Sequence, residues 1–504
     1  MLALGAAVLG LALFFAGSVS RLLTREPFID EAWYSMPAWS LATRGEFGTP
    51  VLETSASPMP GMNVSLRGIR ENTYWVMPLP IFVQAAWYKI TGFGIYSLRA
   101  FCIFWGLVAL AAWLVFIRTL SDNWNAGLLA MAIIAMDPVF ISTASLGRMD
   151  MMSAGLGVAG LASYVVVRRH SLGKAIFVAH ACVAASGLSH PNGGLIYLLV
   201  LLTTMMVLDR RRLRPVHALA AAAPYALGAA GWGLYILRDP DSFMAQFLGN
   251  SGGRFGTLAA LSPLREAQRY LDAYGMNPET AGLAKLKVLL LLFYAAAFAA
   301  LVVSSDLRKK PVAKILLLLS GVAVVALTII DNYKVQWYLI HTVPFFGAVA
   351  GFVLAAILPR FKPLVASGIL VVVLAGVLAV PLAGVVRASA RDPYHRGYLP
   401  AVEYVRRCAF AGSLVMASSE FGFGYGFDQN LIDDIRLGAY TGASADMIVT
   451  DSRHQDAWSR FKRIEPDAYE HITAILADDY EKTLVTPTHT VYVRRPVAEH
   501  CSAN

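Results

Sequence analysis

Residues 28–45 read FIDEAWYSMPAWSLATRG, and the interpretation of the whole chain starts from this stretch. It follows an apolar N-terminal segment directly and opens with two adjacent carboxylates, Asp30 and Glu31. At helical spacing one side of the stretch is mostly apolar and includes Trp33, whereas the other side is polar. This pattern predicts a helix that lies in the membrane surface, with its tryptophans at the level of the lipid headgroups. Pro37 predicts a kink or a second helix start.

The two acids allow two interpretations. Carboxylates at the rim of a membrane cost free energy, so they indicate a functional site. In the first turn of a helix, however, acidic side chains also accept hydrogen bonds from the free N–H groups and complement the helix dipole. The spacing of Asp30 and Glu31 does not decide between a functional pair and a structural cap.

The composition is that of an integral membrane protein. Of the 504 residues, 57% are hydrophobic and only 15% are charged, whereas soluble domains average about 25% charged residues. The formal net charge is +9, but the basic residues occur mostly in short clusters between apolar segments, at 168–174, 210–214, 308–314 and 360–362. This distribution is typical of cytoplasmic loops in a membrane protein and argues against a nucleic-acid partner.

About eleven segments are long and apolar enough to span a bilayer. They are 2–20, 99–118, 124–143, 151–167, 174–189, 192–208, 216–237, 285–303, 312–330, 336–357 and 364–386. An odd number places the two ends of the chain on opposite sides, with every basic cluster on the N-terminal side. We therefore expect a multi-pass protein of a bacterial inner membrane with a cytoplasmic N-terminus. Arg21 and Arg25 fall on the outer side and run against this charge rule.

The composition changes after residue 387, which divides the chain into a transmembrane domain, 1–387, and a small extracytoplasmic α/β domain, 388–504. Periodicity predicts its elements: helices at 400–408 and 467–480, strands at 413–418 and 445–450, and a hairpin at 483–494.

Two features of this domain carry separate expectations. The run FGFGYGF at 421–427 has no Lys-Ser/Thr after it, so it predicts a flexible surface loop rather than a phosphate loop. Cys408 and Cys501 also lie in this domain, and an oxidising compartment would permit a disulfide between them. The sequence leaves open whether they form one or remain two thiols.

The polar residues that could carry chemistry gather at the outer ends of the predicted helices. The acids are Asp30, Glu31 and Asp150, and the cations are Arg148 and Lys334, with Arg67, Arg70 or Arg254 as further candidates. Cations can hold a phosphate as it gains charge, and a carboxylate can accept the proton of an attacking hydroxyl. The set therefore suits a reaction in which a membrane-embedded phosphate leaves and a hydroxyl attacks an oxocarbenium-like centre.

Structural explanations exist for the same residues. Arg148 and Asp150 could form a local pair that caps the following helix. A helix stop and start explains Pro191 and the glycines after His190, although it does not require the histidine itself. Lysine and aromatic residues such as Lys334 and Tyr338 are common anchors at a membrane interface.

Five short motifs, in order along residues 1–360, resemble those of the integral-membrane glycosyltransferases of the GT-C class. The resemblance is to the branch with protein O-mannosyltransferases, lipid A aminoarabinose transferases and rhizobial galacturonosyltransferases. The matching motifs are Asp30-Glu31-Ala-x-Tyr34, Pro78-x-Pro80 with Gly92-Phe-Gly94 and Arg99, Arg148-Met-Asp150, His190-Pro-x-Gly193, and Lys334-x-x-Trp-Tyr338-Leu with Pro344.

The resemblance implies a GT-C-type helix bundle. It also implies that a sugar moves, with inversion, from a polyprenyl-phosphate-linked donor to an acceptor hydroxyl on the outer face. The acceptor would be a cell-envelope glycan, a lipid or a protein. Asp30 would be the candidate base, with Glu31 and Asp150 supporting acceptor and sugar.

The same resemblance implies donor-phosphate contacts from Arg148, Lys334 and Tyr338, with His190 and His341 beside them. Two departures from the family pattern matter. The lysine that precedes the Pro-Pro motif is replaced by Val76-Met77, so Arg67 or Arg70 would substitute for it. His190 stands where the family has a lysine, which weakens phosphate binding at that turn or makes it pH-dependent.

Metal use differs among enzymes of this class, and we predict no metal site. If a divalent cation is used, Asp30 and Asp150 would be its ligands. The main alternative function is a flippase or transporter for polyprenyl-linked sugars. Transporters tend to show inverted repeats and polar residues near the membrane midplane, and the sequence shows neither.

Overall fold

The computed structural model describes residues 1–504 except 53–65, 252–261, 278–279, 281 and 502–504. Within the described part, ten helices are long and apolar enough to cross a membrane. The bundle is built from α1 (Leu2–Thr24), α4 (Ile95–Ser121), α7 (Asp150–Val167), α8 (Leu172–Ser189), α9 (Pro191–Asp209), α10 (Pro215–Ile236), α14 (Lys287–Val303), α16 (Pro311–Ile330), α17 (Val343–Ile357) and α18 (Pro363–Arg391). This architecture confirms the multi-helix membrane bundle expected from composition and periodicity.

The expected span at 124–143 is broken in the structure. It consists of α5 (Trp124–Met136) and α6 (Pro138–Ala144), which are bent by 69°. Pro138 has no N–H to continue the helix. The Asp137 carboxylate begins α6 by accepting the N–H groups of Val139 and Phe140, at 2.8 and 3.2 Å. Tyr274 and Tyr294 donate their hydroxyls to its other oxygen, so the buried charge at the break is fully hydrogen-bonded.

Small residues let the helices at the centre of the bundle approach closely. A Cβ added at Gly10 of α1 would lie 2.9 Å from the backbone of Ala132 in α5. On the opposite side of α5, a Cβ added at Gly351 of α17 would lie 2.3 Å from the nitrogen of Ala130. Glycines at such contacts are typical of helix packing in membranes, where dispersion contacts replace the hydrophobic effect.

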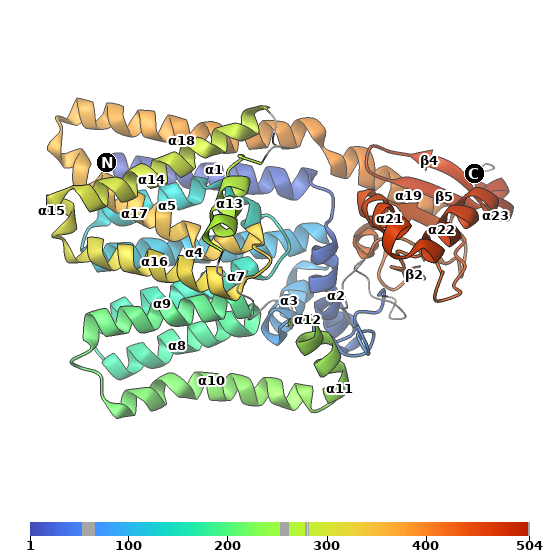
Figure 1. Ribbon diagram of the computed structural model, residues 1–504, viewed down its shortest axis with the longest axis horizontal. Coiled ribbons are helices and arrows are strands. Elements are labelled where there is room, and N and C mark those ends of the chain that lie inside the picture. The colour runs from blue at the N-terminus through green and yellow to red at the C-terminus, as the bar shows by residue number, and fades with distance from the viewer. Residues whose placement is uncertain (53–65, 252–261, 278–279, 281, 502–504) are drawn as a thin grey trace.

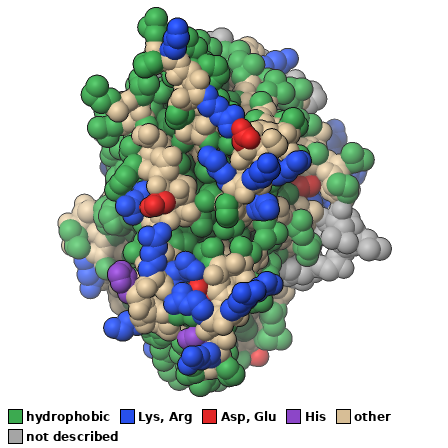
Figure 2. Space-filling model, turned by 90° about the vertical axis from the view of Figure 1, so that its left-hand side faces the viewer, with side chains coloured by type: hydrophobic (Ala, Val, Ile, Leu, Met, Phe, Trp, Pro, Cys, Tyr) green, Lys and Arg blue, Asp and Glu red, His purple; other side chains and the backbone are tan. Residues whose placement is uncertain are grey.

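The two ends of the chain lie at opposite ends of the molecule (Figure 1). The loops after α7, α9 and α17, and the one around α15 (Ser305–Arg308), meet at the end that carries the N-terminus. Lys and Arg side chains gather on this end, as Figure 2 shows. The expected segregation of the basic clusters to one end of the bundle is therefore confirmed.

The stretch 28–45 forms α2 (Ile29–Arg44), a single helix that runs through Pro37 without a second start. The expectation that its tryptophans lie at the lipid headgroups is wrong. Trp33 is 2% exposed, and its indole nitrogen donates to Ser419 Oγ at 2.7 Å. Trp39 is also buried and lies 5.7 Å from the ring of Phe427. The apolar side of α2 is covered by the C-terminal domain rather than by lipid.

The glycine-rich run 421–427 is part of this contact and is not a flexible surface loop. It forms η7 (Ser419–Phe421) and α20 (Gly422–Tyr425). Phe421 and Phe427 are 1% and 4% exposed. The ring of Phe423 stacks on Phe93, which follows α3 (Pro78–Thr91), with centroids 5.7 Å apart. The glycines permit close packing of these aromatic rings between the domains.

The C-terminal part contains a five-stranded mixed sheet in the order β2-β1-β3-β5-β4. Its strands are β1 (Val415–Met416), β2 (Leu431–Ile432), β3 (Met447–Thr450), β4 (Tyr480–Val485) and β5 (Thr490–Arg494). The strand β1 is parallel to both β2 and β3, whereas β5 is antiparallel to β3 and β4. The helices are α19 (Leu399–Cys408), α21 (Ser452–Ile464), α22 (Pro466–Asp478) and α23 (Arg495–Cys501).

The sequence predicted β1, β3, the β4–β5 hairpin, α19 and α22, and missed β2, α21 and α23. The strand β2 has only two residues, which is too short for a periodic pattern. The helix α21 did carry a signal, because Asp451 caps it and Ala457 and Phe461 bury one face at helical spacing. Cys408 and Cys501 are paired as a disulfide, with Cα atoms 5.0 Å apart.

Candidate active site

A chain of three charged side chains connects α2 to the start of α7. The guanidinium of Arg148 donates from Nη1 to Asp30 Oδ2 and from Nε to Asp150 Oδ2, the second at 2.8 Å. Arg148 precedes α7 in a tight turn and Asp150 is the first residue of that helix. Arg148 and Asp150 thus form the local pair of the structural alternative, although no side chain caps α7. Asp30 joins this pair from a position 118 residues away in the sequence.

These three residues differ in their access to solvent. The side chain of Asp30 is 22% exposed, whereas those of Arg148 and Asp150 are 4% and 0% exposed. The third guanidinium nitrogen of Arg148, Nη2, makes no hydrogen bond within the described part of the chain. Tyr34 and Trp337 flank the cation, with ring centroids 5.2 and 6.0 Å away. Of the three charged side chains, Asp30 is therefore the one most accessible to solvent.

Histidines and Tyr338 lie behind Asp150. His190 is the N-cap of α9, and its Nε2 lies 3.7 Å from Asp150 Oδ1. The rings of Tyr338 and His341 lie 5.0 and 6.4 Å from that of His190. A Cβ added at Gly193 would lie 2.7 Å from His341 Cε1, so only glycine fits there. Neither ring nitrogen of His341 makes a hydrogen bond to a described residue.

Glu31 points in another direction and is completely buried. Arg99 of α4 donates to both of its oxygens, at 2.8 and 2.7 Å. The N–H groups of Phe28 and Gly147 also donate to this carboxylate, at 2.9 and 2.8 Å. The bond from Phe28 is the N-terminal cap of α2 that the structural interpretation of the acid pair predicts.

The remaining donors of Arg99 fix the chain between α1 and α2. They bind the carbonyl oxygens of Leu22, Arg25 and Glu26, at 3.2, 2.7 and 2.9 Å. Burial alone would raise the pKa of Glu31, but the Arg99 guanidinium outweighs burial and holds that pKa below its usual value. Glu31 is thus an ionised structural carboxylate that joins α2, α4 and the turn before Arg148.

The arrangement does not suit a divalent cation held by Asp30 and Asp150. The guanidinium of Arg148 lies between the two carboxylates, where a shared cation would have to lie, and offsets one of their two negative charges. In the described part of the chain, no group of three or more His, Cys, Asp or Glu side chains is arranged as metal ligands. We therefore assign no step to a metal.

Lys334 lies in a second charged cluster, beside the first but not part of it. Its ammonium group pairs with Glu266 at 3.2 Å and donates to the carbonyl oxygen of Thr328 at 2.6 Å. Arg269, from α13 (Pro263–Ala273), is completely buried and pairs with both Glu266 and Asp331, at 3.2 and 3.1 Å. The short helix η4 (Gln336–His341) begins two residues after Lys334 and contains Tyr338 and His341.

The predicted phosphate contacts Arg67 and Arg70 are not brought to this site. The side chain of Arg67 is 69% exposed and lies 3.6 Å from Asp241 in α11 (Pro240–Phe243). Arg70 is exposed in the same segment. Arg254 lies outside the described residues.

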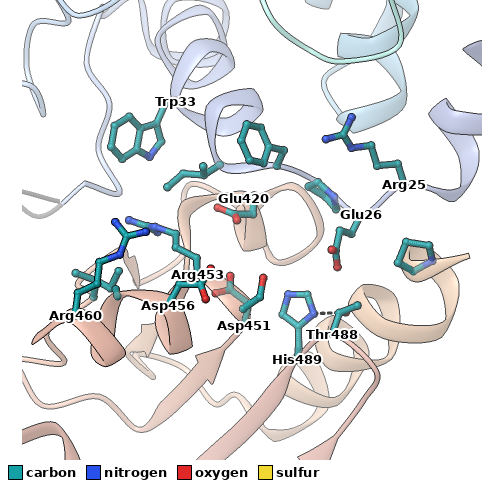
Figure 3. A pocket seen from close by; sticks show the side chains of 17 residues that line it. Arg25, Glu26, Trp33, Glu420, Asp451, Arg453, Asp456, Arg460, Thr488 and His489 are labelled. Atoms are coloured by element: carbon teal, nitrogen blue, oxygen red, sulfur yellow. Dashed lines mark hydrogen bonds between the residues drawn. The ribbon is translucent and has the colours of Figure 1, made fainter. Parts of the chain in front are cut away.

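A cavity of about 500 Å³ lies directly beside α2, between the segment that precedes it and the C-terminal domain (Figure 3). Its floor on the membrane side is formed by Arg25, Glu26, Phe28 and Trp33. From the C-terminal domain, charged side chains point into it, as Figure 3 shows; these are Glu420, Asp451, Arg453, Asp456, Arg460 and His489. The ring of Phe28 lies 6.3 Å from that of Trp337, which in turn lies beside Arg148.

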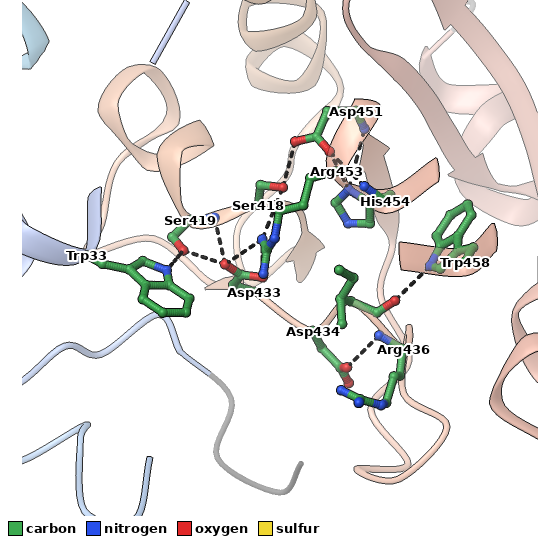
Figure 4. A network of polar contacts seen from close by, with 11 residues as sticks. Trp33, Ser418, Ser419, Asp433, Asp434, Arg436, Asp451, Arg453, His454 and Trp458 are labelled. Carbon is green, nitrogen blue, oxygen red and sulfur yellow. Dashed lines mark hydrogen bonds and ion pairs between the residues drawn. The ribbon is translucent and has the colours of Figure 1, made fainter. Parts of the chain in front are cut away.

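A network of hydrogen bonds holds the wall of this cavity in place (Figure 4). Arg453 binds both oxygens of Asp433, at 3.0 and 3.1 Å. Asp433 accepts the backbone N–H and the hydroxyl of Ser419, the same hydroxyl that accepts the indole N–H of Trp33. The network therefore ties α2 to the C-terminal sheet, and sequence reasoning missed it because its members are far apart in the chain.

Titratable groups at the cavity have displaced pKa values. Burial raises the pKa of Glu420 well above its usual range, Asp451 and Asp433 raise it further, and Arg453 opposes them. Burial lowers the pKa of His489 to about 4. Burial would raise the pKa of Asp451, but contact with His454 and Arg453 holds it below its usual range.

Replacing Glu420 by glutamine is expected to remove one pH dependence of stability. The pKa of Glu420 in the folded protein is raised above its usual value of 4.5. Such a carboxyl stabilises the fold fully at a pH below 4.5, and this stabilisation is lost as the pH rises through the pKa of the folded protein. Glu420→Gln should therefore raise the unfolding midpoint, followed by tryptophan fluorescence in detergent, by several degrees at about pH 8 and much less at about pH 5.

His489 and Asp451 act in the opposite sense, because their folded pKa values are lowered and their contribution to stability is lost as the pH falls. Both wild type and variant contain these residues, so most of their contribution is common to the two proteins. Glu403→Gln, an exposed glutamate of α19, is the matched control. An equal shift of the midpoint at both pH values for Glu420→Gln would contradict the raised pKa.

Comparison with known proteins places this geometry in a structural class. No protein-family model and no curated protein matches the chain. Solved structures do. ArnT from Cupriavidus metallidurans bound to undecaprenyl phosphate has a TM-score of 0.64 and 13% identity, over 97% of this chain and 97% of that chain. The apo oligosaccharyltransferase of Archaeoglobus fulgidus has a TM-score of 0.55 and 12% identity, over 92% of this chain and 72% of that chain.

A third similar structure is the oligosaccharyltransferase AglB of Archaeoglobus fulgidus in complex with an inhibitory peptide and a dolichol-phosphate. It has a TM-score of 0.51 and 12% identity, over 96% of this chain and 74% of that chain. The chain therefore has the fold of the GT-C integral-membrane glycosyltransferases, as its motifs suggested. Within that class, the similarity to ArnT extends over nearly the full length of both chains, including the C-terminal domain.

Proposed function

We propose that the protein is a glycosyltransferase that moves a sugar from a polyprenyl-phosphate-linked donor to an acceptor hydroxyl on the extracytoplasmic face of a bacterial inner membrane. The observation that carries this proposal is the bridge of Arg148 between a solvent-accessible carboxylate, Asp30, and a buried one, Asp150. In this bridge a candidate base, Asp30, is in direct contact with a candidate phosphate-binding cation, Arg148. The fold is shared with ArnT and AglB.

In the proposed step, the acceptor oxygen forms a bond to the anomeric carbon of the sugar while the bond from that carbon to the phosphate oxygen breaks. The electron pair of the broken bond leaves with polyprenyl phosphate. Asp30 accepts the proton of the attacking hydroxyl, and attack from the side opposite the phosphate inverts the anomeric centre. A carboxylate suffices as base because the centre is oxocarbenium-like and the proton leaves late.

Arg148 is the proposed contact of the leaving phosphate. Its Nη2 hydrogens point to no described acceptor, whereas Nε and Nη1 hold the two carboxylates. Charge-assisted hydrogen bonds of this kind stabilise an oxyanion as its charge develops. Asp150 and His190 are positioning residues in this scheme, because they orient Arg148 and are themselves buried. Tyr338 and His341 complete the wall behind them.

The cavity beside Phe28 is the proposed place of the acceptor. It opens between the domains, and charged groups and an indole ring line it. Carboxylates and guanidinium groups supply the donors and acceptors that a polyhydroxy or charged acceptor requires. The residues also favour transfer over transport. In the described part of the chain the paired acids and cations of the site lie at the ends of helices, not in the middle of a span.

Comparison of cells with and without the protein tests the proposal. Glycans, glycolipids and glycoproteins of the cell envelope would be analysed by mass spectrometry, and the protein is expected to add one sugar residue to one class of molecule. Purified protein in proteoliposomes should then transfer that sugar from a polyprenyl-phosphate-linked donor. Movement of labelled donor across the bilayer without covalent transfer would instead identify a flippase.

A further inference from the structure

A second cavity, of about 650 Å³, lies on the other side of the segment that follows α1. Five cations line it. Arg21 and Arg25 come from the end of α1, Lys287 is the first residue of α14, and Arg387 and Arg391 lie in the last turns of α18. Arg21 is oriented by donating to Ser142 Oγ at 3.3 Å.

Among the residues that the structure describes, no carboxylate lines this cavity beside the five cations. Within the described part of the chain, none of the five cations forms an ion pair. Two acids are adjacent to these cations in the sequence, and neither lines this cavity. Glu26 lines the first cavity, on the other side of Arg25, and Asp392 pairs with His395 at 2.8 Å. Five like charges around one cavity repel one another, so a bound anion would stabilise this arrangement.

Two ordinary explanations for such cations do not account for this cluster. Basic residues favour the cytoplasmic side of a membrane protein, but these five lie at the end that carries the C-terminal domain, opposite the basic loops in Figure 2. Cations also favour the C-terminal ends of helices, which fits Arg21 and Arg391. Lys287 is at the N-terminal end of its helix, where the dipole disfavours a cation.

The remaining lining is apolar and borders the lipid-facing surface of α18. Val380, Ala383 and Val386 lie on the same side of that helix as Arg387. Val386 is 69% exposed and the flanking Leu382 is 48% exposed. If a lipid entered the cavity, its apolar chain would therefore lie along this surface, and its headgroup would meet the five cations.

We propose that this cavity binds the phosphate of an anionic lipid from the extracytoplasmic leaflet. Arg387 and Arg391, one helical turn apart on α18, hold the phosphate from one side, and Arg21, Arg25 and Lys287 hold it from the other. Arg25 also lines the cavity beside Phe28, so the bound headgroup lies next to the proposed place of the acceptor. Binding does not depend on the proposed transfer chemistry.

Lipid binding to the full-length protein tests the proposal. Wild type and Arg387→Gln/Arg391→Gln would be placed in phosphatidylcholine nanodiscs and titrated with phosphatidic acid, with bound lipids counted by native mass spectrometry. Both arginines are exposed on α18, so the fold should tolerate the change. The double variant is expected to bind phosphatidic acid at least roughly tenfold more weakly. Arg387→Lys/Arg391→Lys, which keeps the charge, should retain most of the affinity.

The matched control is Arg210→Gln/Arg211→Gln, a pair of exposed arginines in the loop at the opposite end of the bundle. This variant should bind phosphatidic acid at the extracytoplasmic site as wild type does. Equal affinity of wild type and the α18 variant, or an equal loss in the control, would overturn the proposal. The unfolding midpoint of each variant shows whether a loss of binding is a loss of fold.

Two sources of the phosphate are distinguished by a second titration, with polyprenyl monophosphate. If the α18 variant loses both ligands and they compete in wild type, the cavity serves the polyprenyl lipid. If it loses phosphatidic acid alone, the cavity serves another anionic lipid. Asp30→Asn should retain lipid binding in either case, so a failure of sugar transfer and a failure of lipid binding remain separate results.

Discussion

Replacing Asp30 by asparagine is expected to reduce sugar transfer about 10²- to 10⁴-fold, the range that a positioned general base contributes. Asparagine keeps the size of the side chain and an oxygen that can accept from Arg148, but it cannot take the proton of the acceptor hydroxyl. The maximal rate should therefore fall while donor binding changes little. Initial rates would be measured in proteoliposomes with a saturating lipid-linked donor.

The matched control for this experiment is Glu46→Gln, an exposed glutamate just beyond the end of α2. It should transfer sugar at the wild-type rate. Asp30→Glu, which restores a base on a longer side chain, should recover part of the activity. Transfer by Asp30→Asn at the wild-type rate would show that another group removes the proton, and the assignment of the base would be wrong.

The neighbouring acid should behave differently. Glu31→Gln leaves Arg99 completely buried without its carboxylate, and breaking a buried ion pair in this way costs about 3–5 kcal/mol. The expected result is a protein that accumulates poorly in the membrane and unfolds at a lower temperature, measured by the thermal loss of its monodisperse chromatographic peak. The correctly folded fraction should still transfer sugar, because Glu31 does not face the site.

A double variant separates the ion pair from its parts. Arg99→Gln alone should be as damaging as Glu31→Gln, because it leaves the carboxylate buried without its cation. Arg99→Gln together with Glu31→Gln should cost less than the sum of the two single changes, because no unpaired charge remains. If Glu31→Gln instead accumulates normally and loses only activity, Glu31 belongs to the reaction and not to the scaffold.

These contrasting roles follow from the geometry of one helix turn. Successive residues of an α-helix point about 100° apart. Asp30 therefore reaches Arg148 at the surface of the bundle, while Glu31 is directed into the bundle toward α4. Of the two interpretations of the acid pair, the structural one describes Glu31, and the functional one remains a proposal for Asp30. Glu31 completes the cap and the scaffold, and Asp30 is left for the proposed chemistry.

Lys334 illustrates the limit of motif reasoning at this site. Its motif predicted a phosphate contact beside Arg148, but the structure pairs it with Glu266 in a cluster that also contains Arg269. Neither Glu266 nor Arg269 is part of a recognisable motif. Both lie on α13, between the expected spans 216–237 and 285–303, where no element was predicted. For Lys334 to bind the donor phosphate, as its motif predicts, its ammonium group would have to leave or share its contact with Glu266.

The sequence alone determined the membrane class, the approximate number of spans and the segregation of the basic loops to one end of the bundle. Each of these follows from local composition, or from residues a few positions apart, where spacing fixes geometry. The tertiary structure alone decided that Trp33 and Trp39 face protein, that the run 421–427 is buried, and that five cations share one cavity. Those outcomes depend on surfaces contributed by segments hundreds of residues apart, and no local pattern specifies which apolar or charged face will meet which partner.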